Sequence, residues 1–413
     1  MNLRAAQVYI IMMFMTALAS STMFVTHGIY FVAELGLNPV QLVLMGTVLE
    51  LTVLLFEGIT GVVADTYSRR RSVIIGMFVI GAGFVLEGSV MWIGTMIPVL
   101  SLFAWVLVAE LIWGIGHTFI SGADSAWIVD EVGESNVGNL FLQTKRVSLW
   151  GNLLGIGLSV WMSTIAPNLP YVLGGLIYAS VGVFLLFFMK ETAFVGAVHK
   201  QQVSHWQHMK STWLSGASTV RRNPILFMIV GVTLFSGAAS EGYDRLWEMH
   251  LITEIGFPQN MALSMPMWFG LIAMVSTLIS IAAVRITDSR LDMSNERVVF
   301  GAMFGLTAVR IAGIVMLAFS PNLIWALGSI LIVGVVNTLS QPIYETWLNM
   351  NMESKSRATV LSMISQTDAL GQTAGGPIVG WVGSRVSVRA SLITAAVLLG
   401  PILTVFSRAL RRR

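Results

Sequence analysis

Gly61-Val62-Val63-Ala64-Asp65-Thr66-Tyr67-Ser68-Arg69-Arg70-Arg71 is a short polar loop between two long apolar segments. The segments, at about 40–64 and 72–93, each have the roughly 20 residues that a helix needs to cross the hydrocarbon core of a bilayer. Lys and Arg are enriched in the cytoplasmic loops of membrane proteins, so three consecutive arginines place this loop in the cytoplasm. The stretch therefore predicts a membrane-spanning helical hairpin.

The rest of the chain repeats this pattern. Of 413 residues, 55% are apolar and 11% are charged, against roughly 25% charged in soluble domains, which excludes a water-soluble enzyme. There is no Cys, which excludes disulfides, thiolate zinc sites and cysteine nucleophiles. We predict an all-α membrane protein with twelve transmembrane helices in two six-helix bundles. The predicted spans are 7–33, 40–64, 72–93, 98–128, 140–166, 169–190, 224–250, 262–284, 298–319, 322–349, 358–384 and 388–407.

The basic residues orient this topology. With both termini in the cytoplasm, twenty of the 24 Lys and Arg residues lie inside. Only Arg385 and Arg389 lie outside, and Arg245 and Arg310 fall within predicted helices. We therefore expect a multi-pass protein of the cell (inner) membrane with both termini cytoplasmic.

The longest polar stretch, 191–223, separates an N-terminal bundle at 1–190 from a C-terminal bundle at 224–413. Trp206, Met209 and Trp213 recur within it at helical spacing, which predicts a helix lying on the inner membrane surface. The alternative is a partly ordered linker.

Internal repetition supports two related halves. Gly151 and Gly155 match Gly371 and Gly375 at an offset of 220 residues, and Glu134-Ser135 matches Glu353-Ser354 at 219. Parallel repeats of this kind are typical of transporters with two bundles around a central path.

The loop quoted above resembles the signature G-x-x-x-D-x-x-G-R-[RK] of the major facilitator superfamily. Gly61, Asp65, Arg69 and Arg70 match, whereas Ser68 replaces the second glycine. The resemblance implies a conformational latch at these four residues, with Gly61 permitting close helix approach and Asp65 paired with an arginine. An ordinary basic turn is the alternative. The counterpart in the second half, Asp288-Ser289-Arg290, keeps little of the signature.

A second stretch, Ser121-Gly122-Ala123-Asp124-Ser125-Ala126-Trp127-Ile128-Val129-Asp130, resembles the macrolide and tetracycline-type efflux branch, which implies proton-linked drug export. Many such exporters carry R-x-x-Q-G-x-G in the fourth helix. Glu110 and Trp113 stand here in place of the arginine and the glutamine, so the arginine-assisted proton step of those exporters is not carried over. The fifth segment also lacks the proline of the antiporter pattern.

Charges inside predicted helices are the candidates for chemistry, because each costs roughly 2.5 to 3.5 kcal/mol at a helix centre unless it is paired or hydrated. Acids greatly outnumber arginines there, so we expect some of them to bind protons. Glu50 and Glu57 share a helix face, as do Glu110 and His117, each pair being seven residues apart. These four residues and Asp368 are the proton-coupling candidates. His117 could instead be a histidine hydrogen-bonded between helices.

Two polar groups predict a substrate cavity. The first lies in 224–250 and the second near the end of 322–349, and Trp113 could add an aromatic wall. The first group could instead be a self-neutralising network that fixes the helix end, with Arg245 between two acids. The remaining substrate-cavity candidates are Glu241, Asp244, Arg245, Glu248, Asn337, Gln341, Tyr344 and Glu345.

These observations favour a proton-coupled antiporter that exports lipophilic cationic or zwitterionic drugs by rocker-switch alternating access. The alternatives are a proton- or sodium-coupled symporter for a polar metabolite and a non-transporting sensor or scaffold. The expected partners are a small-molecule substrate, protons and the bilayer, with the protein a monomer. The sequence has no Walker loop and no H-E-x-x-H motif, so we expect no enzyme activity, cofactor, metal or nucleic-acid partner.

Overall fold

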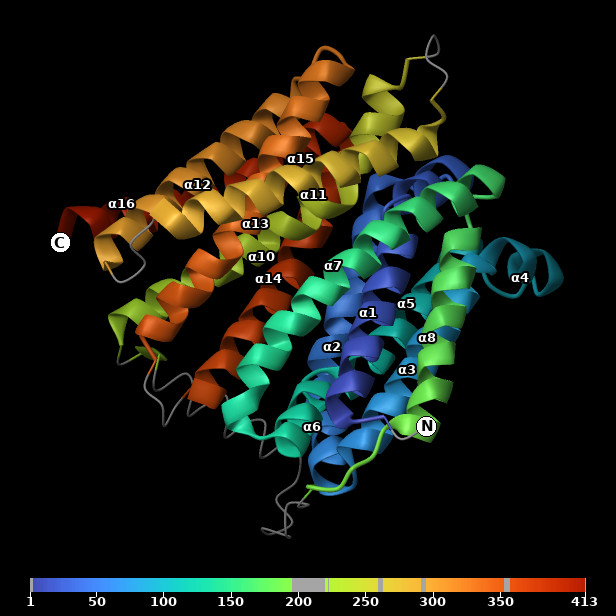
Figure 1. Ribbon diagram of the computed structural model, residues 1–413. Coiled ribbons are helices and arrows are strands. Elements are labelled where there is room, and N and C mark those ends of the chain that lie inside the picture. Colours follow the sequence, from blue (N-terminus) through green and yellow to red (C-terminus); the bar gives the residue numbers. More distant parts are fainter. Residues whose placement is uncertain are drawn as a thin grey trace. The chain divides into compact units, whose positions relative to one another are not determined.

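The computed structural model describes residues 3–194, 220–221, 223–258, 263–290, 295–352 and 357–412 (Figure 1). Every regular element in these ranges is helical, which confirms the all-α prediction. The predicted surface helix with Trp206, Met209 and Trp213 lies outside the described residues, as does the pair Glu353-Ser354.

The first half begins each predicted span within a few residues of its expected position. Ser68 and Ser101 cap α3 and α5 by accepting hydrogen bonds from the backbone N–H groups of Arg71 and Ala104. The predicted span 98–128 is interrupted by Gly122, whose φ of 74° separates α5 from α6. The elements are α1 Ala5–Phe24, η1 Ile29–Glu34, α2 Pro39–Thr66, α3 Arg69–Gly88, α4 Val90–Met96, α5 Leu102–Ile120, α6 Ala123–Val132, α7 Glu134–Ile165 and α8 Leu169–Phe188.

The second half follows the same order. Asn223, Asn295 and Asn322 cap α10, α12 and α13 through their side-chain carbonyl oxygens. The predicted span 388–407 divides into α15 and α16 immediately before Pro401. The elements are α10 Pro224–His250, η2 Leu251–Ile255, α11 Met265–Arg290, α12 Glu296–Ala318, α13 Leu323–Met350, α14 Arg357–Arg385, α15 Val388–Leu398 and α16 Gly400–Arg412.

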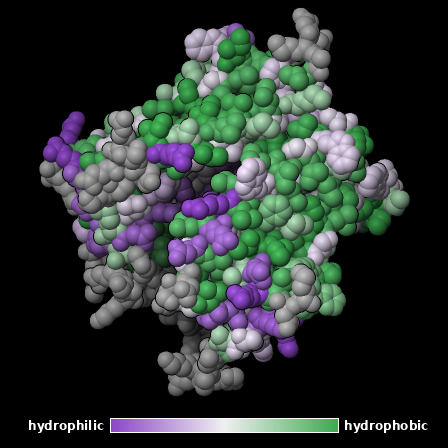
Figure 2. All heavy atoms as spheres, viewed as in Figure 1, coloured by the Kyte–Doolittle hydropathy of each residue, from purple (hydrophilic) through white to green (hydrophobic). Residues whose placement is uncertain are grey.

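Ten helical stretches of the described part are long and apolar enough to cross a membrane. The helices at the predicted fifth and eleventh spans, α7 and α14, are not among the ten, so the count of twelve spans stays a prediction. Apolar side chains cover much of the face seen in Figure 2, as expected for a protein whose surroundings are lipid.

Both repeated glycine pairs lie at helix crossings. A Cβ on Gly155 of α7 would be 2.6 Å from the carbonyl oxygen of Leu18 in α1. A Cβ on Gly375 of α14 would overlap the Cα atom of Ala238 in α10. The glycines recognised from the offset of 220 therefore let corresponding helices of each half pack backbone to backbone.

The two halves also share a corner. In each, the end of a long helix passes into a π-turn, η1 or η2, and then into a glycine with left-handed backbone, Gly36 at φ 64° or Gly256 at φ 73°. By residue contacts the chain forms two compact units. The first unit consists of 1–36, 51–205 and 263–270, and the second of 37–50, 206–262 and 271–413.

Candidate functional site

The second unit encloses a polar cavity of about 500 Å³, which we call the C-unit cavity. Its walls come from α10, α12, α13 and α14, and Leu399 and Ile402 close one side. Thirteen of its twenty lining residues carry hydroxyl, amide or charged groups. The polar lining residues are Thr233, Ser236, Ser240, Asp244, Thr307, Arg310, Asn337, Ser340, Gln341, Tyr344, Glu345, Ser365 and Asp368.

Three carboxylates and one guanidinium give the C-unit cavity its charge. Glu345 accepts a hydrogen bond of 2.9 Å from Gln341. Asp368 accepts one of 2.9 Å from Gln372. Asp244 and Arg310 face the same space from α10 and α12. The lining therefore has a surplus of negative charge around a single cation.

The hydrogen bonds of the cavity-lining residues are only partly made within the protein. The Nε atom of Arg310 and the Oδ1 atom of Asn337 are buried and have no hydrogen-bond partner among the described residues. Tyr344 and Thr233 share a hydrogen bond of 2.5 Å between their hydroxyl groups. Buried polar atoms are normally paired, so these two unpaired atoms of Arg310 and Asn337 beside the cavity are exceptions.

Six residues predicted from the sequence meet in this cavity: Asp244, Asn337, Gln341, Tyr344, Glu345 and Asp368. The other charged residues predicted on α10 do not line it. Arg245 pairs with Glu241 at 3.1 Å from Nε to Oε1, Glu241 packs against Gly46, and Glu248 is buried. The four charged residues of α10 therefore do not share one face toward the cavity. Among them, only Asp244 lines it.

Sequence reasoning missed Arg310 and the hydroxyl groups of α10. Arg310 was recognised as a charge inside a predicted helix but was given no role. Thr233, Ser236, Ser240 and Asp244 follow one another at spacings of three, four and four residues, which places them on one helix face. That polar stripe was the available signal.

The first unit places its predicted residues differently. Trp113 packs against Phe24 and Phe84, with ring centroids 5.6 and 4.9 Å apart, instead of forming a wall of the C-unit cavity. Glu110 is buried in α5 with 1% of its surface exposed, whereas His117 is exposed.

The acids of α2 are less deeply placed. Glu57 accepts a hydrogen bond of 3.4 Å from Ser121, just beyond α5, and Glu50 is half-buried. These acids remain proton-coupling candidates, apart from the C-unit cavity.

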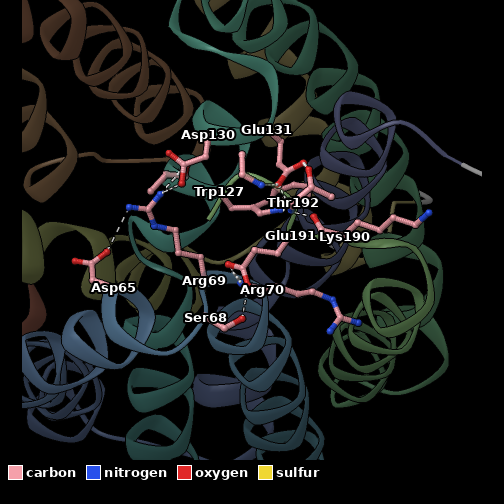
Figure 3. A network of polar contacts seen from close by, with 12 residues as sticks. Asp65, Ser68, Arg69, Arg70, Trp127, Asp130, Glu131, Lys190, Glu191 and Thr192 are labelled. Atoms are coloured by element: carbon pink, nitrogen blue, oxygen red, sulfur yellow. Dashed lines mark hydrogen bonds and ion pairs between the residues drawn. The ribbon is translucent and has the colours of Figure 1, made fainter. Parts of the chain in front are cut away.

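The predicted latch forms an ionic network at one end of the first unit (Figure 3). Arg69 lies 3.5 Å from Asp65, forms an ion pair with Asp130, and donates a hydrogen bond of 3.2 Å to the carbonyl of Ala126. Among the described residues, no atom of another helix lies within 4 Å of where a Cβ on Gly61 would be, so close helix approach there stays a prediction. The side chains of Asp288, Ser289 and Arg290 lie outside the described part.

Arg70 and α6 hold the end of α8 (Figure 3). Arg70 donates to the carbonyls of Met189 and Leu186 at 2.5 and 2.7 Å. The Nε1 atom of Trp127 donates to the carbonyl of Lys190 at 2.8 Å, and Glu131 accepts from the hydroxyl of Thr192 at 2.6 Å. These contacts hold the chain in place where it leaves α8.

Comparison with known proteins agrees with this architecture. Residues 9–372 match the Major Facilitator Superfamily. The uncharacterized MFS-type transporter YxaM of Bacillus subtilis is 23% identical over 364 residues, which cover 87% of this chain and 84% of YxaM.

Solved structures share the fold at low identity. A crystal structure of the nucleoside transporter NupG is 12% identical, with a TM-score of 0.74 and 99% of each chain covered. A POT family transporter in complex with 5-aminolevulinic acid is also 12% identical, with a TM-score of 0.70, covering 98% of this chain and 95% of that one. The match over most of the chain, together with its helical halves and ionic loop, shows that this chain belongs to the Major Facilitator Superfamily and is a membrane transporter, not an enzyme.

Proposed function

We propose that the chain is a secondary transporter of a small polar solute, which binds in the C-unit cavity. The observation that carries this proposal is the lining itself, where amides, hydroxyls and charges surround about 500 Å³ of space. A lipophilic compound would displace water from these polar side chains without replacing its hydrogen bonds, and an unsatisfied buried polar group costs roughly 1 to 3 kcal/mol. A hydrogen-bonding solute satisfies them.

The charges indicate which polar solute fits. Arg310 presents a guanidinium that suits a carboxylate, a phosphate or another strong acceptor. Asp244, Glu345 and Asp368 present negative charge toward the same space and suit an amine. A zwitterionic solute uses both features, and the similar structures named for nucleosides and for a complex with 5-aminolevulinic acid support a polar cargo.

Proton coupling follows from the same carboxylates. A proton on Asp244 or Asp368 removes negative charge from the cavity, so it weakens the site for an amine and competes with it. Glu50, Glu57, Glu110 and His117 of the first half are further proton carriers in this proposal.

A second candidate is the export of lipophilic cationic drugs in exchange for protons. The surplus of carboxylates favours a cation, and Met303, Leu348 and Leu361 give the cavity an apolar side. In this case Arg310 would repel the cargo, which is why we place the polar solute first.

A stabilisation screen separates the two candidates. The purified chain is heated with nucleosides, dipeptides, 5-aminolevulinic acid or tetraphenylphosphonium, at two pH values. We expect a polar compound to raise the unfolding temperature, and Asn337→Leu to weaken its binding about tenfold, or roughly 1.4 kcal/mol. The matched control is Thr338→Val, the next residue of α13, which does not line the cavity.

Stabilisation by tetraphenylphosphonium alone, lost in Asp244→Asn, would overturn the polar-solute proposal in favour of drug export. Uptake of the stabilising compound into proteoliposomes under an imposed pH gradient then gives the direction of transport and shows whether protons drive it.

A further inference from the structure

His250 lies at the end of α10, and each of its ring nitrogens has an oxygen atom within 3.4 Å. The side chain is fully buried. Its Nε2 atom is 3.1 Å from the carbonyl oxygen of Leu317 in α12. Its Nδ1 atom is 3.4 Å from the Oε2 atom of Glu254, one turn further along the chain in η2, and forms no hydrogen bond with the described residues.

Nδ1 and Glu254 attract each other only with one more proton than a neutral histidine and an ionised glutamate carry. A backbone carbonyl can only accept, so Nε2 must hold the single proton of a neutral imidazole. The lone pair of Nδ1 would then face a carboxylate oxygen with no hydrogen between them. The contact becomes attractive when a proton lies there, either on the ring or on the carboxyl group.

Arg389 of α15 offers Glu254 another partner. Its Nη2 atom is 3.9 Å from the same Oε2 atom, and its guanidinium lies over the ring of Phe319, 5.8 Å from the centroid. Among the described residues, Glu254 and Arg389 are the charged groups that face His250, while α12 contributes the Leu317 carbonyl. When the proton leaves, Glu254 can turn from His250 to Arg389.

The first half contains the same corner, but a tyrosine takes the place of the histidine, so no group corresponds to Nδ1. At the offset of 220 residues, Tyr30 and Glu34 correspond to His250 and Glu254. Tyr30 is also fully buried, and its hydroxyl donates a hydrogen bond of 2.8 Å to the carbonyl of Glu87 in α3. Glu34 is exposed. One hydrogen-bond donor is therefore enough to join the π-turn to the neighbouring helix. The contact between His250 and Glu254 in the second half is not needed for that join.

We propose that His250 and Glu254 form a proton-binding site at the end of α10, and that Arg389 takes over Glu254 when the proton has left. Taking up the proton ties η2 to His250 and α12, and releasing it ties η2 to α15. The site lies outside the C-unit cavity and does not depend on which solute that cavity binds. It faces the side of the membrane opposite the basic loops in the predicted topology.

Two spectroscopic measurements on the full-length protein test this site. Histidine labelled with ¹⁵N reports whether each ring nitrogen holds a proton, and His250→Gln identifies the His250 signals. Infrared difference spectra report whether Glu254 carries a proton, through a carboxylic acid band that disappears in Glu254→Gln. Both are followed from about pH 5 to about pH 9, across the ordinary range of histidine titration.

We expect one of the two groups to carry the extra proton at the lower pH and to lose it as the pH rises. In Glu254→Gln the amide N–H supplies the missing hydrogen, so His250 should stay neutral throughout and its signals should not move. Glu34→Gln, the matched change in the first half, should leave the His250 titration unchanged. A neutral His250 beside an ionised Glu254 over the whole range would overturn the proposal.

A second variant guards against misfolding. His250→Tyr copies the arrangement that already folds in the first half, so it should keep the Leu317 contact. We expect it to remain folded and to bind one proton fewer per chain in a direct titration. An unchanged proton count in the folded variant would also contradict the proposed site.

Discussion

The interiors of the two units differ although their scaffolds correspond. In the first unit, aromatic rings fill the space between α1, α3, α5 and α8. The ring centroid of Phe84 lies within 6.2 Å of those of four other rings, Trp113, Tyr171, Tyr178 and Phe24. In the second unit, α10, α12 and α13, the counterparts of α1, α3 and α5, surround the C-unit cavity together with α14. The repeated glycines therefore keep the same helix crossings in both units. The residues between the crossings form a packed aromatic interior in the first unit and line a polar cavity in the second.

The largest effect should come from emptying the aromatic interior. Phe84→Ala removes a side chain that is 1% exposed, and we expect it to lower the free energy of unfolding by about 3 to 5 kcal/mol. Tyr344→Ala enlarges a cavity that already exists, so its loss should be clearly smaller. Denaturant unfolding of both variants in the same detergent measures this. Equal losses would mean that the two interiors are not as different as their packing indicates.

The shared crossings should respond alike in both units. Gly155→Val and Gly375→Val each place a side chain against the backbone of a neighbouring helix, and we expect each to destabilise the protein by about 1 to 3 kcal/mol. Gly157→Val in α7 is the control, because among the described residues no atom of another helix lies within 4 Å of its Cβ position. Thermal unfolding of the three variants shows whether the two crossings contribute equally to stability. A Gly375→Val variant as stable as the unchanged protein would contradict this.

The smallest expected effect is a difference in stability between two tyrosine-to-phenylalanine variants. Tyr30→Phe leaves the Glu87 carbonyl without its donor in a packed region, so we expect a loss of about 1 kcal/mol. Tyr344→Phe should cost less stability, because Thr233 keeps its 2.9 Å hydrogen bond to the carbonyl of Ile229 and the cavity admits water. Unfolding temperatures measured side by side decide the order. A larger loss for Tyr344→Phe would show that the cavity wall is held together by this contact.

Much of the fold could be predicted from the sequence, because long apolar runs separated by basic loops determine where membrane helices begin and end. The break at Gly122 was missed, since one glycine inside an apolar segment does not reveal its φ angle. The C-unit cavity could be predicted in part, because Asp244, Asn337 and Asp368 are polar residues in apolar helices.

Positions that depend on neighbouring helices could not be predicted. Helical spacing shows which residues share a face, but not which helix that face meets, so Trp113 was assigned to a cavity wall instead of the aromatic interior. The spacing of His250 and Glu254 is visible in the sequence. The Leu317 carbonyl fixes which ring nitrogen of His250 holds a proton, and it comes from a helix more than sixty residues away.

The paired π-turns also show that one backbone corner accepts two different side chains. In each, the backbone N–H group bonds a carbonyl five residues earlier, Leu35 to Tyr30 and Gly256 to Leu251, both at 2.9 Å. A left-handed glycine, Gly36 or Gly256, stands at the end of each turn and lets the chain leave the helix. Because the backbone bond and the glycine supply the turn in both halves, the buried position can hold tyrosine in one and histidine in the other without a different chain path.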